Sequence, residues 1–240
     1  LASGEEGAEW AKLLRTDFGG EDLVYVDEVK IVDVEYGYLP LTYDPSKAKL
    51  VLFESPERRG KWTVYTVAYD TEGILIIFDR KKVLKWLNPD EPELDERSIK
   101  KRFVHLTPEE EEKVLTLIHT ISHALLQTIH IYSGLSRDNF SEVLFIHVPA
   151  ILIITKRSAN LAALRTIFEY AHYPWFSAAR ERVSKCAYDP ICLEENGACH
   201  ACLYVPEYCC TYWNKYLDRN AILGLPYSGR DFERFWREVG

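Results

Sequence analysis

Hydrophobic positions in the first half of the chain gather in short runs that are rich in β-branched and aromatic residues. Gly, Pro and charged residues separate these runs, as turns separate strands. The runs span residues 22–43, 49–55, 61–69 and 73–78. Helical spacing of apolar positions occurs on either side of them, in residues 5–18 and 80–87. The pattern predicts a mainly β N-terminal half with a short helix at each end.

The second half of the chain has longer helical patterns. Thr107 precedes a Pro at the first helical position and a Glu at the third, which is a typical helix N-terminus. We expect that helix to run from Pro108 to Ser133 and to stop at Gly134. Buried strands are expected over residues 142–146 and 150–155, and helices over residues 158–182, 212–223 and 231–239. The fold class that follows is α+β, with a mainly β N-terminal half and a mainly helical C-terminal half.

A polar, proline-bearing segment, residues 88–97, separates the two halves. Such a segment is the best candidate for a boundary between lobes. The sequence therefore predicts a mainly β lobe over residues 1–95 and a helical lobe over residues 96–240 that contains the cysteines, or one continuous domain.

Composition and charge narrow the function classes. The chain has 240 residues, of which 47% are hydrophobic and 28% charged, and this is ordinary for a globular protein. A net charge of −8 argues against a protein that coats nucleic acid by bulk electrostatics. The most apolar run, residues 143–155, is too short to span a bilayer and contains His147 and Pro149. We find no signal peptide, and we expect a cytoplasmic protein with no membrane partner.

All six cysteines lie between Cys186 and Cys210. Two residues separate Cys199 from Cys202, which is the usual half-site of structural zinc. Disulfides would need an oxidising compartment, and a redox dithiol would need a strand-to-helix turn that this segment lacks. An iron–sulfur cluster also takes four cysteines. Zinc fits the context best, and we expect a structural site because four protein ligands leave no open position for water.

The cysteine segment resembles a known family, the MrfA-type zinc-binding domain. This domain forms the C-terminus of MrfA-like repair helicases, and the likeness is closer to its longer form in DrmB proteins of DISARM antiphage systems. The resemblance rests on these pieces of the sequence: Asp189-Pro190-Ile191-Cys192, Cys199-His200-Ala201-Cys202, Pro206-Glu207, Cys210, Asn214 and Leu217-Asp218-Arg219. Weaker matches extend the likeness to residues 23–223.

The resemblance implies a four-cysteine zinc lobe in the helical half. The family motif is in register with Cys210 rather than Cys209. The zinc ligands that follow are Cys192, Cys199, Cys202 and Cys210. Whether Cys186 or Cys209 joins the metal shell stays open. One departure occurs at residues 158–163, where the family has a Gly-rich turn.

The resemblance also implies an accessory or scaffold protein that acts with a helicase or nuclease partner in antiviral defence or DNA repair and contacts DNA. No Gly-x-x-x-x-Gly-Lys-Ser/Thr loop and no Gly-x-Ser-x-Gly elbow occurs in the sequence. We therefore expect no ATPase motor and no serine hydrolase in these residues. The alternative is a metal-dependent nuclease subunit, with Glu54, Asp79 and Lys81 as candidate residues at strand ends.

Two further groups have both a functional and a structural interpretation. His119, His123 and His130 fall roughly on one helix face, where they either bind a metal or pack against the cysteine lobe or a strand. Basic residues beside aromatic ones lead into the cysteine segment, where they either stack single-stranded bases or belong to a helix with a buried aromatic face. These residues are Tyr173, Trp175, Phe176, Arg180, Arg182 and Lys185.

Overall fold

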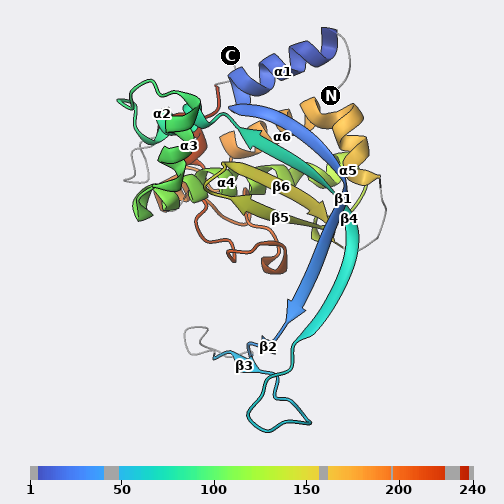
Figure 1. The fold of residues 1–240 in the computed structure, drawn as a ribbon. Coiled ribbons are helices and arrows are strands. Elements are labelled where there is room, and N and C mark those ends of the chain that lie inside the picture. The colour runs from blue at the N-terminus through green and yellow to red at the C-terminus, as the bar shows by residue number, and fades with distance from the viewer. Residues whose placement is uncertain (1–4, 41–48, 157–161, 196, 225–232, 238–240) are drawn as a thin grey trace.

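The computed structural model describes residues 5–40, 49–156, 162–195, 197–224 and 233–237. Within them, four strands form one antiparallel sheet in the order β1-β4-β6-β5 (Figure 1). Their bounds are β1 Gly20–Glu35, β4 Tyr65–Phe78, β5 Phe140–Phe145 and β6 Ala150–Thr155. A separate pair joins β2 Gly37–Tyr38 to β3 Val51–Leu52.

Both halves of the chain contribute to the main sheet. The expected runs at residues 61–69 and 73–78 lie largely in one strand, β4, which pairs with β1 on one side and β6 on the other. One hydrophobic core cluster likewise takes side chains from both halves. The expected α+β class is confirmed, with most of the sheet in the N-terminal half and most of the helices in the C-terminal half. The lobe boundary at residue 95 stays a prediction.

A two-stranded ribbon projects from the body of the protein (Figure 1). It exists because β6 pairs with β4 only from Gly73 to Ile77, whereas the β1–β4 pairing continues to Glu35 and Tyr65. A register shift between Val26 and Val29 marks the point where the ribbon leaves the sheet. Several large apolar side chains on both of its faces are exposed to solvent, which is the notable feature of this element.

The long helix α4, Pro108–Ser133, forms the centre of the helical layer and packs against β5, β6 and α6 (Figure 1). The expected capping is present: the Thr107 side chain accepts from the Glu110 N–H, and Gly134 ends the helix in the left-handed conformation. By length and hydropathy α4 is a candidate membrane span, but 89% of its most apolar window is buried inside the protein. We therefore describe α4 as a core helix.

The remaining helices surround this centre. The N-terminal half contributes α1 Glu5–Phe18, α2 Arg80–Leu87 and α3 Glu96–Val104. The C-terminal half contributes short turns at Arg137–Asn139 and Glu207–Cys209, together with α5 Ala163–Thr166, the π-helical η3 Ile167–Ala171, α6 His172–Ser184, α7 Ile191–Glu195 and α8 Asn220–Leu223. The helical prediction for residues 158–182 holds from Ala163 onward, and residues 158–161 lie outside the described part of the chain.

Two expected helices are wrong in their described parts. Over residues 212–223 the backbone forms turns, with Trp213, Asn214 and Tyr216 at positive φ, and only α8 is helical. The side chain of Asn214 explains this, because it hydrogen-bonds both the N–H and the C=O of Val205 and so holds a loop. Within 231–239, the described residues 233–237 contain no helix, and their two aromatic side chains are buried against the core.

Candidate metal centre

Four cysteine sulfurs converge between the end of α6 and the loop after α7. They belong to Cys186, Cys192, Cys199 and Cys202. The Sγ atom of Cys199 lies 3.4 Å from that of Cys186 and 3.7 Å from that of Cys202, and the Sγ atoms of Cys192 and Cys202 are 3.8 Å apart. None of these separations is a disulfide bond, and all six thiols are free.

The sulfur positions fit one zinc ion. A tetrahedral ion with Zn–S bonds of about 2.3 Å holds its sulfurs ~3.8 Å apart. The three separations above lie close to this value, and every pair in the group lies within 4.8 Å. An iron–sulfur cluster would hold its cysteines farther apart, because several iron atoms lie between them. The geometry therefore favours a single closed metal position with four thiolate ligands.

The structure differs from the expected ligand set in one member. It brings Cys192, Cys199 and Cys202 together, as expected, but the fourth sulfur is that of Cys186. Cys210 lies in a different group, and Cys209 is buried beside the backbone of Asp138. The physical reason is the turn after Val205, which directs the Cys210 side chain toward α4 rather than toward the other cysteines.

Backbone hydrogen bonds shape the loop around these sulfurs. The carbonyl oxygen of Cys199 accepts from the N–H groups of Cys202, Leu203 and Tyr204, at 3.1, 3.0 and 3.0 Å. The Cys199 N–H in turn donates to the Sγ of Cys202 at 3.2 Å. N–H groups that point at sulfur stabilise its thiolate form, which is the form that binds metal. The turn is therefore arranged to present two thiolates to one ion.

A buried ion pair supports the same loop. Arg219 has a side chain with no exposed surface, and it binds both oxygens of Asp189 in a bidentate pair. Asp189 also accepts from the N–H of Cys186 at 3.0 Å. Arg219 donates further to the carbonyls of Gly197 and Val183 at 3.3 and 3.0 Å. These contacts give a physical role to the Asp-Pro and Leu-Asp-Arg pieces of the sequence, which hold the cysteine loop in place.

The thiol pKa values follow from burial and neighbouring groups. Burial raises the pKa of Cys192 to about 11, and it also raises the pKa of Cys202. Burial acts the same way on Cys199, but hydrogen bonds from Cys186 and other neighbours bring its pKa below the ordinary value. The thiols of Cys192 and Cys202 thus keep their protons until a cation replaces them, and zinc binding releases those protons.

A second group combines residues from three elements: His119 and His123 of α4, Glu142 of β5, and Cys210. All four are buried. The Nε2 atom of His119 lies 3.2 Å from Cys210 Sγ and 3.0 Å from Glu142 Oε1, and His123 Nε2 lies 3.3 Å from the same oxygen. His130, the third histidine singled out in the sequence, is exposed and lies outside this group.

Interactions among the side chains of this second group shift the pKa values of His123 and Cys210. Burial would lower the pKa of His123, but its bonds to Cys210 and Glu142 raise that pKa to about 9. Burial would raise the pKa of Cys210, but the two histidines lower it to about 6. Glu142 was not among the residues singled out in the sequence. The signal for it was a single carboxylate at the start of an otherwise apolar strand.

The candidate nuclease residues do not form a carboxylate cluster in the described part of the chain. Asp79 is the N-cap of α2, and its side chain accepts from the N–H groups of Lys81 and Lys82. Glu54 lies beyond β3, where its backbone forms an isolated antiparallel bridge with that of Trp62. The roles of these side chains are therefore local, and the structure gives the nuclease alternative no support.

The basic and aromatic residues of α6 divide into two sets. Trp175 and Phe176 are fully buried, as the structural interpretation expected. Tyr173, Arg180 and Lys185 instead line an open cleft of about 890 Å³. Arg234 and Arg237 from the C-terminal segment also line it, together with Glu181. Asp17 beside the cleft pairs with Arg180 at 3.4 Å and with Arg237 at 4.0 Å. The basic side chains that line this cleft outnumber the acidic ones.

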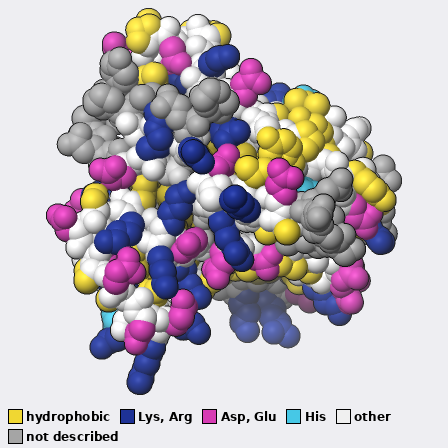
Figure 2. Space-filling view, turned by 90° about the horizontal axis from the view of Figure 1, so that it is seen from above, with side chains coloured by type: hydrophobic (Ala, Val, Ile, Leu, Met, Phe, Trp, Pro, Cys, Tyr) yellow, Lys and Arg dark blue, Asp and Glu magenta, His cyan; other side chains and the backbone are white. Residues whose placement is uncertain are grey.

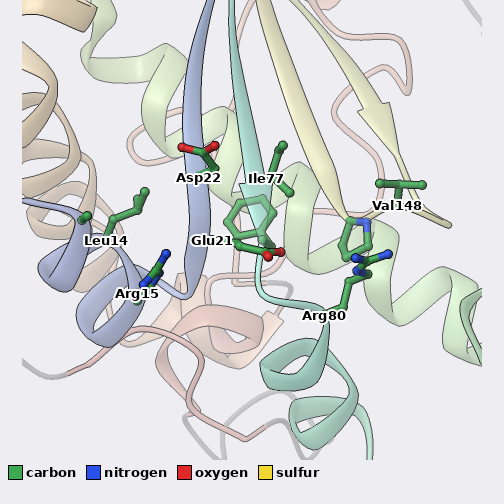
Figure 3. A pocket seen from close by; sticks show the side chains of 10 residues that line it. Leu14, Arg15, Glu21, Asp22, Ile77, Arg80 and Val148 are labelled. Atoms are coloured by element: carbon green, nitrogen blue, oxygen red, sulfur yellow. The ribbon is translucent and has the colours of Figure 1, made fainter. Parts of the chain in front are cut away.

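Another cleft, of about 460 Å³, lies between α1, the start of β1 and the end of β4 (Figure 3). Its charged side chains are those of Arg15, Glu21, Asp22 and Arg80, which balance in sign, and no cysteine or histidine lines it. Seen from above, basic and acidic side chains are interspersed over the face of the protein (Figure 2). We therefore assign no metal chemistry to this cleft.

Comparison with known proteins agrees with the metal geometry. Residues 121–203 match the family model of the MrfA Zn-binding domain. The chain is 27% identical over 204 residues to the DISARM protein DrmB of Bacillus paralicheniformis, covering 75% of this chain. It spans 36% of the length of that relative. The expected resemblance is confirmed, and the four converging cysteines form a structural zinc site within or next to the matched residues.

Proposed function

We propose that this chain is a non-enzymatic, zinc-stabilised scaffold module that acts with a helicase or nuclease partner in antiviral defence or DNA repair, in the cytoplasm. Its zinc ion is held by the four converging sulfurs of Cys186, Cys192, Cys199 and Cys202. The resemblance to DrmB supports the defence role. The closed thiolate set supports scaffolding rather than catalysis, because it leaves no coordination position for a substrate or water.

The observation that carries the scaffold proposal is the apolar surface of the ribbon. Val32 and Val34 lie on one face of it and Val67 on the other, since Val67 pairs with Asp33. Their exposed fractions are 58%, 49% and 64%. Exposed apolar side chains on a projecting element of this kind favour a contact with another protein. We therefore place the partner contact on the ribbon, away from the zinc.

The cleft on α6 is the surface that best suits a DNA strand. Cations along a groove attract the phosphate backbone, and an exposed aromatic ring offers a stacking platform. The cleft has both, with the exposed side chains of Lys185 and Arg237 on its wall and Tyr173 at 46% exposure. It also lies next to the cysteine lobe, because Arg182 of the same helix donates to the Cys202 carbonyl.

Affinity purification of the tagged chain from cells that carry its neighbouring genes tests the scaffold proposal. We expect a helicase or nuclease to co-purify with the wild-type chain, identified by mass spectrometry. The combined change Val32→Thr, Val34→Thr and Val67→Thr keeps the β-branched shape but removes exposed apolar surface, and should reduce the retained partner at least ~10-fold.

The matched control is Val104→Thr, which changes an exposed valine at the end of α3, off the ribbon. It should leave the amount of retained partner unchanged. Absence of any helicase or nuclease from the wild-type sample would contradict the proposal. Equal loss of partner in the ribbon variant and the control would contradict the placement on the ribbon.

A further inference from the structure

We propose that the chain has a second metal site, in which His119, His123, Glu142 and Cys210 hold a zinc ion. This group is separate from the four-cysteine site and lies in the core between α4, β5 and the loop that contains Cys210. Two of its members, His119 and Cys210, lie outside the residues that match the MrfA Zn-binding domain.

The distances between the ligand atoms fit one ion. Zinc bonds of about 2.1 Å to nitrogen and oxygen and about 2.3 Å to sulfur place tetrahedral neighbours ~3.3–3.6 Å apart. His119 Nε2 lies 3.0 Å from Glu142 Oε1 and 3.2 Å from Cys210 Sγ, and His123 Nε2 lies 3.3 Å from Glu142 Oε1. The four ligand atoms all lie within 4.8 Å of one another. Small inward or outward shifts of these side chains would complete the tetrahedron.

The orientation of both histidines is the one that metal ligands adopt. His119 Nδ1 lies 3.2 Å from the carbonyl oxygen of Tyr216, and His123 Nδ1 lies 2.9 Å from that of Leu203. A carbonyl can only accept, so each Nδ1 carries the proton and donates it. In a neutral ring this leaves the lone pair on Nε2, directed at the other members of the group. A backbone carbonyl that orients a ligating histidine in this way is usual around zinc.

The group has more acceptors than donors without a cation. The lone pairs of two Nε2 atoms, a carboxylate and a sulfur would face one another, and Glu142 Oε2 has no hydrogen-bond partner among the described residues. Protons on the rings supply donors in the metal-free protein, but the two rings lie 4.4 Å apart in the core. Two imidazolium charges at that distance repel each other and lose their hydration. A single divalent ion instead accepts one lone pair from each of the four ligand atoms.

The charges also balance at this site. One Zn²⁺ ion cancels the carboxylate of Glu142 and the thiolate of Cys210, and the two histidines remain neutral, so the buried complex carries no net charge. The N–H of Asn214 donates to Cys210 Sγ at 3.2 Å and stabilises the thiolate. All four ligands come from the protein, which makes this a structural site that fixes the cysteine lobe to α4 and β5.

Metal analysis of the purified full chain tests the inference. We expect about two zinc ions per chain for the wild-type protein, and about one for His123→Asn and for Cys210→Ser. Cys209→Ser is the matched control, because it removes the adjacent buried thiol, which lies outside both groups. His130→Asn is the second control, because it removes an exposed histidine of the same helix. Both controls should keep about two ions.

X-ray absorption at the zinc edge of the wild-type protein gives a test that does not depend on how the variants fold. Together the two sites contain five sulfur ligands and three nitrogen or oxygen ligands. The spectrum averages over both ions, so it should show about 2.5 sulfur and about 1.5 nitrogen or oxygen neighbours per zinc. Four sulfur ligands per ion and about one zinc per chain would overturn the inference. Equal loss of zinc in Cys209→Ser and Cys210→Ser would also overturn it.

Discussion

Arg219 is a fully buried cation whose partners are Asp189, the Gly197 carbonyl of the cysteine loop and the Val183 carbonyl near the end of α6. A site with four thiolates and one Zn²⁺ ion carries net negative charge, and Arg219 is the nearby positive charge that offsets it. The pKa of Arg219 is raised above its ordinary value: burial opposes this, but Asp189 and two cysteines outweigh burial.

We predict that Arg219→Met lowers the free energy of unfolding by about 3 kcal/mol, because it leaves Asp189 without its partner in a largely buried position. Urea denaturation measures this. The control is Arg165→Met, since Arg165 makes an exposed helix pair with Glu169 and its loss should have little effect on stability. Equal effects of the two changes would contradict the supporting role of Arg219.

Gly197 offers a second test at the same scale. It has φ of +66°, and a Cβ atom there would lie 2.1 Å from the Asp218 side chain. Gly60 has φ of +78° but open space around it. Both Gly→Ala changes carry the cost of a left-handed residue, about 1 kcal/mol. Gly197→Ala should cost at least ~1 kcal/mol more than Gly60→Ala by the same denaturation measurement, because the Asp218 clash is added. Equal costs would show that the loop around Gly197 adapts.

At the scale of elements, the N-terminus of α4 links stability to pH. The hydrogen bond from Arg102, with further bonds from Thr107, lowers the pKa of Glu110 from 4.5 to about 2. Because the folded-state pKa lies below the unfolded value, the stabilisation is complete above pH 4.5. It is lost as the pH falls from 4.5 toward 2.

We therefore predict that Glu110→Gln lowers the free energy of unfolding by about 1 kcal/mol at neutral pH, a modest value because the pair is partly exposed. At the acid end of that range the variant and the wild-type protein should converge. Denaturation at several pH values measures this. Glu109→Gln is the control, because it removes a mostly exposed carboxylate from the same helical turn. A constant difference at all pH values would contradict the assignment to Glu110.

Elements with local signals were the ones that the sequence predicted well. Thr107, Pro108 and Glu110 act on their own backbone, so the start of α4 follows from a few adjacent residues. The segment around Phe235 and Trp236 behaved differently. The adjacent side chains of Phe235 and Trp236 are both buried in the core. The Phe235 N–H donates to the carbonyl of Ile222 and not to a carbonyl one helical turn before it. Tertiary packing decided that segment, and no local pattern reports it.

The metal ligands, too, could be predicted only where adjacent residues carry the signal. The spacing of Cys199 and Cys202 identified one half-site from adjacent residues. The choice between Cys186 and Cys210 for the fourth position depends on how the loop after Val205 turns, and Asn214 controls that turn through its side chain. Glu142 joins His119 only because β5 packs against α4, a contact that no sequence spacing displays.

At the scale of the whole molecule, the exposed apolar side chains of the ribbon and the basic side chains of the α6 cleft lie on different elements. The ribbon extends from one end of the sheet, whereas α6 lies in the body of the protein (Figure 1). Under the proposed function, the ribbon holds the protein partner and the cleft receives a DNA strand. The zinc lobe lies against α6, where Arg182 donates to the Cys202 carbonyl.

We predict that Tyr173→Ala weakens binding of a single-stranded oligonucleotide about 10-fold, because a stacking ring is lost from the cleft. Fluorescence anisotropy at about 0.1 M salt measures the dissociation constant. Tyr170→Ala is the control, since that side chain is 79% exposed and does not line the cleft. Absence of binding by the wild-type chain, or equal effects of both changes, would contradict this DNA site.

We propose that zinc held by Cys186, Cys192, Cys199 and Cys202 folds the cysteine lobe. Zinc content, measured together with the thermal unfolding temperature for Cys186→Ser and Cys209→Ser, tests this. We expect Cys186→Ser to lose about one zinc ion per chain and to unfold at a lower temperature, because metal binding supplies folding free energy. Cys209→Ser should match the wild-type protein. Wild-type zinc content in Cys186→Ser would contradict the claim.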